Sequence, residues 1–191
     1  MDEYLIEYIE GSISAVESVR AMIPSIQKAA DCIATCLTSG GTVYFAGNGG
    51  SAADAQHLAA ELMGRFDFER APLKAICLNT DTSLLTAIAN DYGYDSVFSR
   101  QIHGHAARGD VAVLISTSGE SPNIVAALKA AHEIGVRTIG LTGSPESMLA
   151  KECDIALAVG TFATSHVQEA HGAIGHAMCG YVEQSLFPQS Q

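Results

Sequence analysis

The sequence predicts a doubly wound α/β domain, in which a parallel sheet carries helices on both faces. From Thr42 onward, short apolar runs without polar alternation are separated by amphipathic helical stretches, a pattern typical of buried parallel strands joined by helices. Two of these runs end in turns that are rich in glycine or in hydroxyl side chains. Because parallel crossovers are right-handed, consecutive units of this kind wind into one sheet that is covered on both sides.

The first forty residues predict two helices that precede the sheet. Residues 3–20 place apolar side chains at helical spacing, namely Leu5, Ile6, Ile9, Ile13, Val16 and Val19. Pro24 suits the first turn of a second helix, and the run Ser39-Gly40-Gly41 ends it.

Five strands are expected after these helices, each β-branched or otherwise apolar: Thr42–Ala46, Ala75–Leu78, Val111–Ile115, Thr138–Leu141 and Ile155–Val159. Helices are expected at about 51–63, 82–90, 95–107, 122–134, 145–152 and 166–185. A chain of 191 residues has the size of one domain. We therefore expect a single domain over residues 1–191, composed of an N-terminal helical pair (1–40), an α/β core (41–186) and a frayed tail (187–191).

The composition limits the classes of function. Apolar residues make up 48% of the chain and charged residues 16%, which excludes a disordered protein. Ten Lys and Arg against 21 Asp and Glu leave a formal charge of −11, and such a surface repels nucleic acid. No stretch of the sequence approaches the roughly 20 apolar residues that span a bilayer. We expect neither a nucleic-acid partner nor a membrane partner.

Cysteine usage predicts a reducing compartment. The five cysteines are odd in number and include no CxxC pair, and the acidic start of the chain lacks the basic region of a secretory signal. A disulfide framework is therefore not expected, and we expect a cytoplasmic protein.

The turn after the first expected strand has the features of an anion site. In Gly47-Asn48-Gly49-Gly50-Ser51, the glycines let the backbone approach a ligand, and Ser51 can cap the helix that follows. The N–H groups of that first helical turn attract an anion. The alternative is a dinucleotide site, since Gly47-x-Gly49-x-x-Ala52 satisfies a loose fingerprint. That alternative is weaker, because Asp81 lies thirty residues beyond Ser51 rather than at the ribose position, and no GK[ST] sequence follows as in a P-loop.

The turn after the third expected strand is rich in hydroxyl groups. The run Ser116-Thr117-Ser118-Gly119-Glu120-Ser121 carries four hydroxyl side chains, and Ser121 precedes Pro122 as an N-cap residue would. A phosphate bound here would find hydroxyl and backbone donors without Lys or Arg. Open α/β sheets bind ligands at the edge where both turns lie, so we expect one shared anion site. A plain capped helix is the alternative.

Histidine and carboxylate side chains gather in two helical segments. His57 and Glu61 are four residues apart and share a helix face. The segment 165–176 holds three His, one Glu and one Gln. Imidazole, carboxylate and amide oxygen suit zinc or another borderline divalent ion better than magnesium. The spacing leaves open whether His171 or His176 takes part, and ordinary surface or core histidines are the alternative.

Five motifs follow one another along the chain: Gly47-Asn48-Gly49-Gly50-Ser51, His57-x-x-x-Glu61-Leu-x-x-Arg65, Ala89-Asn90-Asp91-Tyr92-Gly93, Ser116-Thr117-Ser118-Gly119 and Gln168-Glu169-x-His171. In this order they resemble the phosphoheptose isomerases, which are the sedoheptulose 7-phosphate isomerases of the SIS (sugar isomerase) superfamily. The resemblance covers nearly the whole chain and is densest from Thr42 to Thr142.

The resemblance implies a five-stranded parallel core, a homotetramer and active sites at subunit contacts. It implies isomerisation of sedoheptulose 7-phosphate to D-glycero-D-manno-heptose 7-phosphate through an enediolate, the first step of bacterial heptose nucleotide biosynthesis. One Zn²⁺ per subunit would be held by His57, Glu61, Gln168 and His176, with Glu61 and His176 as the catalytic acid–base pair. Substrate contacts are implied for Asn48, Gly49, Gly50, Ser51, Glu61, Asn90, Asp91, Ser116, Thr117, Ser118, Ser121 and Gln168.

The implied chemistry and the helix geometry set one condition. Aldose–ketose isomerisation requires a base, an acid and an electrophile, and zinc supplies the last as a Lewis acid. Gln168 and His176 are eight residues apart, about 12 Å along a straight helix. Either Gln168 precedes the regular helix and folds back, or the two ligands around one ion come from different chains.

Two departures and two alternatives accompany the resemblance. His166 stands where many relatives carry Arg, so an anion contact is missing here, and the loop 142–147 is poorer in glycine than the usual form. The alternatives are a non-catalytic member that senses a sugar phosphate or binds the replication initiator, and an isomerase for a different ketose phosphate. Initiator-binding relatives tend to lack the glutamate at the position of Glu61 and the last histidine, and this chain keeps both.

Overall fold

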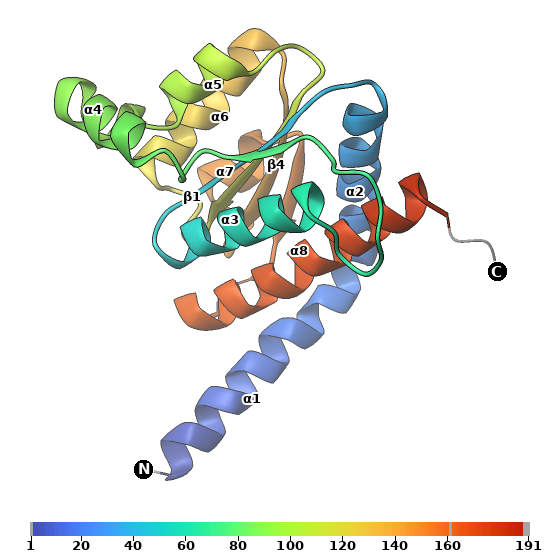
Figure 1. Ribbon diagram of the computed structural model, residues 1–191. Helices are drawn as coiled ribbons and strands as arrows, with labels where there is room; N and C mark the ends of the chain where they lie inside the picture. Colours follow the sequence, from blue (N-terminus) through green and yellow to red (C-terminus); the bar gives the residue numbers. More distant parts are fainter. Residues whose placement is uncertain (1, 161, 189–191) are drawn as a thin grey trace.

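The computed structural model describes residues 2–160 and 162–188 (Figure 1). Its helices are α1 (Asp2–Ser18), α2 (Ile23–Thr38), α3 (Gly50–Met63), α4 (Thr82–Tyr92), α5 (Ser99–His105), α6 (Pro122–Ile134), α7 (Met148–Glu152) and α8 (Thr164–Leu186), with the 3₁₀ turns η1 (Val19–Met22) and η2 (Tyr94–Ser96). The strands are β1 (Val43–Gly47), β2 (Ala75–Cys77), β3 (Val111–Ser116), β4 (Arg137–Thr142) and β5 (Ile155–Ala158).

The strands form one parallel sheet in the order β2-β1-β3-β4-β5, which confirms the predicted fold class. Each strand lies within one residue of its predicted bounds, because an apolar run bounded by turn residues marks a buried strand closely. The chain places β2 on one side of β1 and then crosses to place β3 on the other side. The carboxyl ends of β1 and β3 therefore flank the switch point where open α/β sheets bind ligands.

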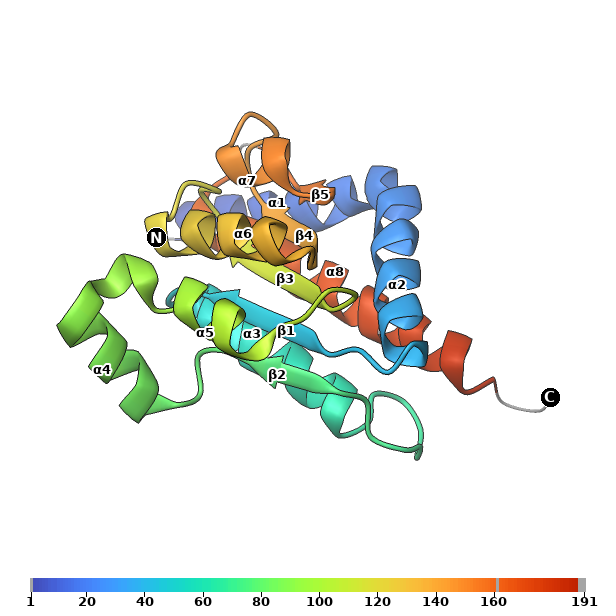
Figure 2. The same cartoon turned by 90° about the horizontal axis from the view of Figure 1, so that it is seen from above.

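Two apolar cores lie on the two faces of the sheet. Alternate side chains of β1 enter them: Phe45 packs with residues of α2, α3 and α8, whereas Tyr44 packs with residues of α4, α5 and α6. Figure 1 shows α3 and α8 side by side, and Figure 2 shows α5 and α6 on the opposite side of the sheet. The pair α3 and α8 forms the framework of the site described below.

Helix α1 leaves much of its apolar face uncovered. It packs against α8, yet its free end extends away from the sheet (Figure 1). The predicted apolar residues of this helix are mostly exposed, with fractions of 57% for Leu5, 58% for Ile6, 56% for Ile9, 58% for Ile13 and 40% for Val16. The helical spacing was therefore right, but the single chain does not bury this face.

The expected helix over 95–107 is wrong as one element. The structure divides it into η2 and α5, because Val97 and Phe98 between them are fully buried and turn the chain into the core. Helix α8 ends at Leu186, directly before the expected tail, whose first residue still contacts the domain: the backbone N–H of Phe187 donates to the carbonyl of Glu183, and its ring lies near the guanidinium of Arg70. Residues 189–191 of the expected tail lie outside the described residues.

Candidate active site

The loop after β1 enters α3 through two glycines with different roles. Gly49 is the N-cap residue, with φ +57°, a backbone conformation that glycine adopts without steric cost. Gly50 has an ordinary φ, but a Cβ at this position would overlap the carboxamide of Gln168 on α8. The prediction that Ser51 caps the helix is wrong, because the helix starts at Gly50 and Ser51 lies inside it, 6% exposed.

The loop after β3 is organised by the Ser116 hydroxyl. Ser116 Oγ lies 3.0 Å from Ser121 Oγ and 3.3 Å from Ser118 Oγ, and it accepts a hydrogen bond from the N–H of Gly119. Ser121 occupies the predicted N-cap position of α6, but its hydroxyl faces Ser116 and makes no capping bond. Ser116 is buried and Ser118 is exposed, so Ser118 is the hydroxyl of this pair that a ligand can reach.

The hydroxyl loop opens onto a small cavity of mixed polar and apolar lining at the start of α8. The cavity has a volume of about 210 Å³, and its lining includes Thr117, Ser118, Ser144 and Thr164. Hydroxyl side chains of the loops after β3 and β4 and of the first residue of α8 therefore line one space, and such donors suit an anionic group.

Of the other predicted substrate residues, Asn48 contacts a residue beside the second loop, whereas Asn90 and Asp91 do not. The side chain of Asn48 bonds to Asn123 and to Tyr94. Asn90 and Asp91 lie exposed near the end of α4, and Asn90 Nδ2 donates to Asp91 Oδ1 at 2.7 Å. Asp91 lines a different cavity, between α4 and α5. Among the described residues, no side-chain contact therefore joins Asn90 or Asp91 to the two loops.

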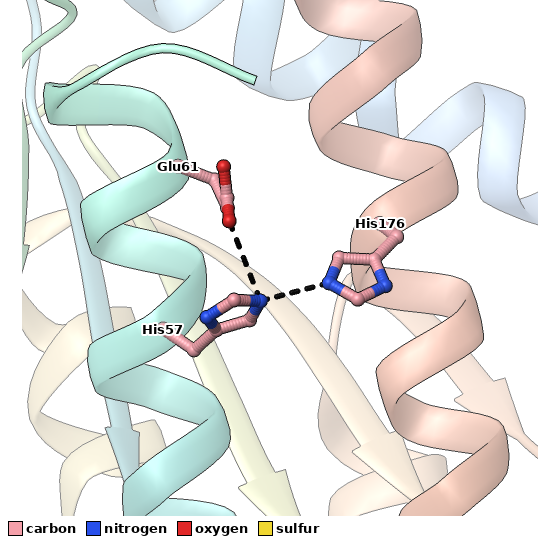
Figure 3. Close-up of side chains that lie close together, drawn as sticks. All are labelled: His57, Glu61 and His176. Atoms are coloured by element: carbon pink, nitrogen blue, oxygen red, sulfur yellow. Dashed lines mark hydrogen bonds and ion pairs between the residues drawn. The ribbon is translucent and has the colours of Figure 1, made fainter. Parts of the chain in front are cut away.

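Three predicted metal ligands meet between α3 and α8 (Figure 3). His57 Nε2 lies 2.8 Å from His176 Nε2 and 3.4 Å from Glu61 Oε1. One ligand atom of each residue lies within 4.8 Å of the other two. The arrangement arises because the i, i+4 spacing places His57 and Glu61 on one face of α3, and α8 packs along that face. We call this cluster of His57, Glu61 and His176 the triad.

The choice between His171 and His176 is decided by burial. His171 is fully buried on α8, and burial lowers the pKa of its imidazole to about 4, against a smaller opposite effect of the Thr142 backbone. His176 is exposed toward α3, five residues further along the helix. His176 therefore joins the triad, whereas His171 belongs to the core as a neutral side chain.

A partly buried carboxylate accompanies the triad. Asp54 lies on α3 one turn before His57, and its Oδ2 is buried without a hydrogen-bond partner in the described part of the chain. Burial raises the pKa of Asp54, while the nearby His57 and His176 act to lower it. The donor set of the site is thus two imidazoles with carboxylates beside them, which suits a borderline divalent ion.

Gln168 lies inside α8, which begins at Thr164. The alternative that Gln168 precedes the regular helix is therefore wrong. Its carboxamide packs against Gly50, which lies seven residues before His57 on α3, about 10 Å along the helix. Gln168 thus borders the first loop of its own chain and lies about two turns from the triad.

His166 fastens α1 to α8. It is 8% exposed, and its Nδ1 lies 3.1 Å from Ser12 Oγ and 3.3 Å from Glu169 Oε2. The ring of Tyr8 packs against it edge-on, with ring centroids 4.6 Å apart. His166, which the resemblance sets against an arginine, therefore has a packing role in this chain.

Residues at and beside the site that had not been singled out from the sequence include Asn123, Arg70 and Glu183. Asn123 contacts Asn48 across the two loops, and a buried ion pair between Arg70 and Glu183 joins the loop after α3 to α8. The partners in both pairs are far apart in the sequence, so no local spacing pattern could have identified these residues as part of the site.

The architecture defines the class of protein: a parallel α/β domain with two ligand-facing loops at the switch point of its sheet and the triad beside it. The SIS domain family matches residues 7–143 of the chain, in agreement with this architecture. None of the described helices combines the length and the apolar composition that crossing a bilayer requires.

Similar proteins place the chain more narrowly. A phosphoheptose isomerase of Rhodospirillum rubrum is 52% identical over 163 residues, which cover 85% of this chain and 87% of that protein. A phosphoheptose isomerase of Burkholderia pseudomallei (strain 1710b) is 44% identical, with 98% of each chain covered. The structure of phosphoheptose isomerase from Neisseria gonorrhoeae matches with a TM-score of 0.90 at 42% identity, over 96% of this chain and 98% of that one. This chain belongs to the phosphoheptose isomerase family of SIS-domain proteins.

Proposed function

We infer that the chain is an aldose–ketose isomerase that converts sedoheptulose 7-phosphate to D-glycero-D-manno-heptose 7-phosphate, the first step of bacterial heptose nucleotide biosynthesis. The observation that carries this inference is the triad, in which two imidazoles and one carboxylate meet between α3 and α8 and offer the acid and base groups that an isomerisation requires. The names of the relatives, at 44% and 52% identity, support the same activity. They favour an isomerase over a non-catalytic sensor or a partner of the replication initiator.

The chemistry assigns a role to each group of residues. Glu61 takes the proton from the carbon next to the carbonyl, and His176 passes protons to and from the substrate oxygens as the enediolate forms and collapses. Thr117, Ser118 and Ser121 bind the phosphate together with the N–H groups that open α6, and the buried Ser116 organises their loop. The backbone of Gly49, Gly50 and Ser51 and the side chain of Gln168 contact the sugar.

The ligand atoms of the triad fit a divalent metal, because two imidazoles and one carboxylate converge within 4.8 Å. We assign one zinc ion per chain to His57, Glu61 and His176, with Gln168 as the fourth ligand. A bound divalent ion would supply a Lewis acid that stabilises negative charge on the substrate oxygens.

The fourth ligand points to an assembly of subunits. Gln168 and His176 of one chain are separated by about 12 Å of regular helix, so we assign the fourth position to Gln168 from a second copy. The exposed apolar face of α1 supports such an assembly, since large uncovered apolar patches mark protein interfaces. The assembly is a homotetramer with active sites at the subunit contacts.

All five cysteines are free thiols, which supports a cytoplasmic location.

Incubation with sedoheptulose 7-phosphate tests the function. We expect a new aldose phosphate in the NMR spectrum of the mixture and none with the Glu61→Gln variant. Fructose 6-phosphate and ribulose 5-phosphate in parallel reactions separate the heptose isomerase from an isomerase of another ketose phosphate. Turnover of a shorter ketose alone, or no turnover of any, would contradict the assignment.

Chelation and dilution test the metal and the tetramer. Removal of the metal should abolish turnover and lower Tm, and zinc should restore both, because a ligand that binds only the folded state stabilises it. Ile9→Glu on the exposed face of α1 should reduce the mass measured by light scattering and the activity together. Glu7→Gln on the same helix provides the control. A fully active, metal-loaded monomer would contradict the shared site.

A further inference from the structure

Two asparagines form a reciprocal amide pair across the ligand-binding edge of the sheet. Asn48 Nδ2 donates to Asn123 Oδ1 at 2.8 Å, and Asn123 Nδ2 donates to Asn48 Oδ1 at 2.8 Å. The hydroxyl of Tyr94 donates to the same Asn48 oxygen at 3.2 Å. Asn123 is 2% exposed and Asn48 is half-buried, so the pair is shielded from competing water.

The pair joins the two loops of the site just beyond the last backbone pairing between β1 and β3. Gly47 and Ile115 are partners in the ladder between β1 and β3, and the two loops separate directly after them. Asn48 leads into Gly49 and the start of α3, and Asn123 is the second residue of α6. The amide pair therefore sets the position of the first loop relative to the hydroxyl loop.

We propose that Asn123 is a positioning residue, which acts through Asn48 to hold the two loops where their donors converge on one sugar phosphate. The proposal rests on the function inferred above. The Asn48 oxygen already accepts two hydrogen bonds, one from Asn123 and one from Tyr94. Asn48 therefore contributes to binding through the loop that it anchors and not through a direct contact of its carboxamide oxygen with the substrate.

The first test compares substrate binding with turnover. Asn123→Ala should raise KM for sedoheptulose 7-phosphate and Kd for inorganic phosphate by roughly tenfold, the loss expected when neutral hydrogen bonds no longer organise a binding site. We expect kcat to change less than about threefold and the metal content to stay the same, because the triad lies further along α3 and α8. Calorimetry measures phosphate binding without turnover.

A matched variant separates positioning from a loss of stability. Thr138 is fully buried at the opposite end of the sheet, and its hydroxyl makes two hydrogen bonds with Asp154. Thr138→Ala should therefore lower Tm in the same way as Asn123→Ala, yet leave KM and phosphate affinity unchanged. If Asn123→Ala is recovered unfolded, Asn123→Ser, which keeps a polar group at the position, is measured in its place.

The double variant Asn48→Ala/Asn123→Ala tests whether the pair acts as one unit. We expect its KM to be no higher than that of either single variant, since contacting residues are not additive. Independent, multiplying effects would overturn the proposal, as would an Asn123→Ala variant with the KM of Thr138→Ala. If the wild-type protein binds phosphate with this dependence but does not isomerise, the proposed function fails and the positioning role stands. If the wild-type protein binds no phosphate, the positioning role fails.

Discussion

Arg70 Nε lies 2.9 Å from Glu183 Oε1 in an ion pair whose side chains are 1% and 0% exposed. The guanidinium also donates to the backbone carbonyls of Glu61 and Leu62 near the end of α3. The carboxylate accepts hydrogen bonds from the loop after α3, from the N–H groups of Phe66, Asp67 and Phe68. Because the triad lies on α3 and α8, this pair fixes the two helices that carry it relative to each other.

Loss of this ion pair should destabilise the fold. We expect Glu183→Gln to lower the free energy of unfolding by about 3–5 kcal/mol, because it leaves a buried guanidinium without its counter-charge. The new amide group would also face backbone N–H donors that need an acceptor. Urea denaturation of the two proteins measures the difference.

The exposed pair between Lys151 and Glu146 provides the control. These side chains are 56% and 81% exposed, with a nitrogen-to-oxygen distance of 3.0 Å. Lys151→Gln should cost less than about 1 kcal/mol, since solvent screens exposed ion pairs. A loss for Glu183→Gln no larger than this would contradict a stabilising role of the buried pair.

The same carboxylate should make stability depend on pH. Burial acts to raise the pKa of Glu183, but the hydrogen bonds from Phe66, Asp67 and Arg70 outweigh it, so the pKa lies below the ordinary 4.5. A folded pKa below the unfolded one means that the unfolded state binds more protons in this range, so stability falls as the pH falls. The contribution is fully present above the unfolded pKa, which is the ordinary value of 4.5, and is lost as the pH passes down through the folded pKa.

Measurement of the unfolding free energy between about pH 6 and about pH 3 tests this dependence. We expect Glu183→Gln to flatten the acid side of the curve, because it has no carboxyl group to protonate. An acid side parallel to that of the wild-type protein would show that other carboxylates cause the effect.

The acid–base pair should carry the chemical step. We expect Glu61→Gln and His176→Gln each to lower kcat by roughly 10²-fold or more, the usual scale for a positioned acid or base. Circular dichroism should show both variants folded. Gln56→Ala, an exposed change on the same helix, should retain kcat. Near-wild-type turnover in either variant of the pair would remove that residue from the proposed role.

The exposed serine of the hydroxyl loop should affect binding and not the metal. Ser118→Ala removes a hydroxyl that lies at the cavity beside α8. We expect KM for the sugar phosphate to rise by roughly 10- to 100-fold, as for the loss of one hydrogen bond to a charged group. Metal content, measured by atomic absorption, should not change. Unchanged KM together with unchanged inorganic phosphate affinity would place the phosphate elsewhere.

The two glycines before α3 should respond differently to alanine. Gly50→Ala forces the new methyl group into the Gln168 carboxamide, and overpacking of this kind costs about 1–3 kcal/mol. Gln168→Ala in the same chain should restore the stability. Gly49→Ala should cost about 1–2 kcal/mol through its positive φ, and Gln168→Ala should not restore it. Thermal denaturation measures the stability of each variant. If Gln168→Ala restores the stability of both glycine variants, or of neither, this distinction is contradicted.

Much of the fold could be predicted from local patterns. The five strands and the positions of both loops follow from apolar runs that end in glycine or serine. The break at Val97 and Phe98 could not be predicted, because two adjacent apolar residues also fit a helical pattern. Their burial in the core, which ends η2 before α5 begins, depends on tertiary packing. The exposure of Ile9 could not be predicted either, since apolar periodicity marks a face but not the partner that covers it.

The sequence by itself determined the order of helices and strands, the positions of the glycine-rich and hydroxyl-rich loops and the candidate ligands, because backbone propensity and burial pattern act over a few residues. Only the tertiary structure decided that His176 and not His171 faces His57. The two residues of that contact are 119 positions apart, and packing of α3 against α8 brings their nitrogens to 2.8 Å. Tertiary contacts also placed Asn123 of α6 against Asn48 after β1, and Glu183 of α8 against Arg70. Such contacts depend on how the whole chain closes around its two cores, and no short segment contains that information.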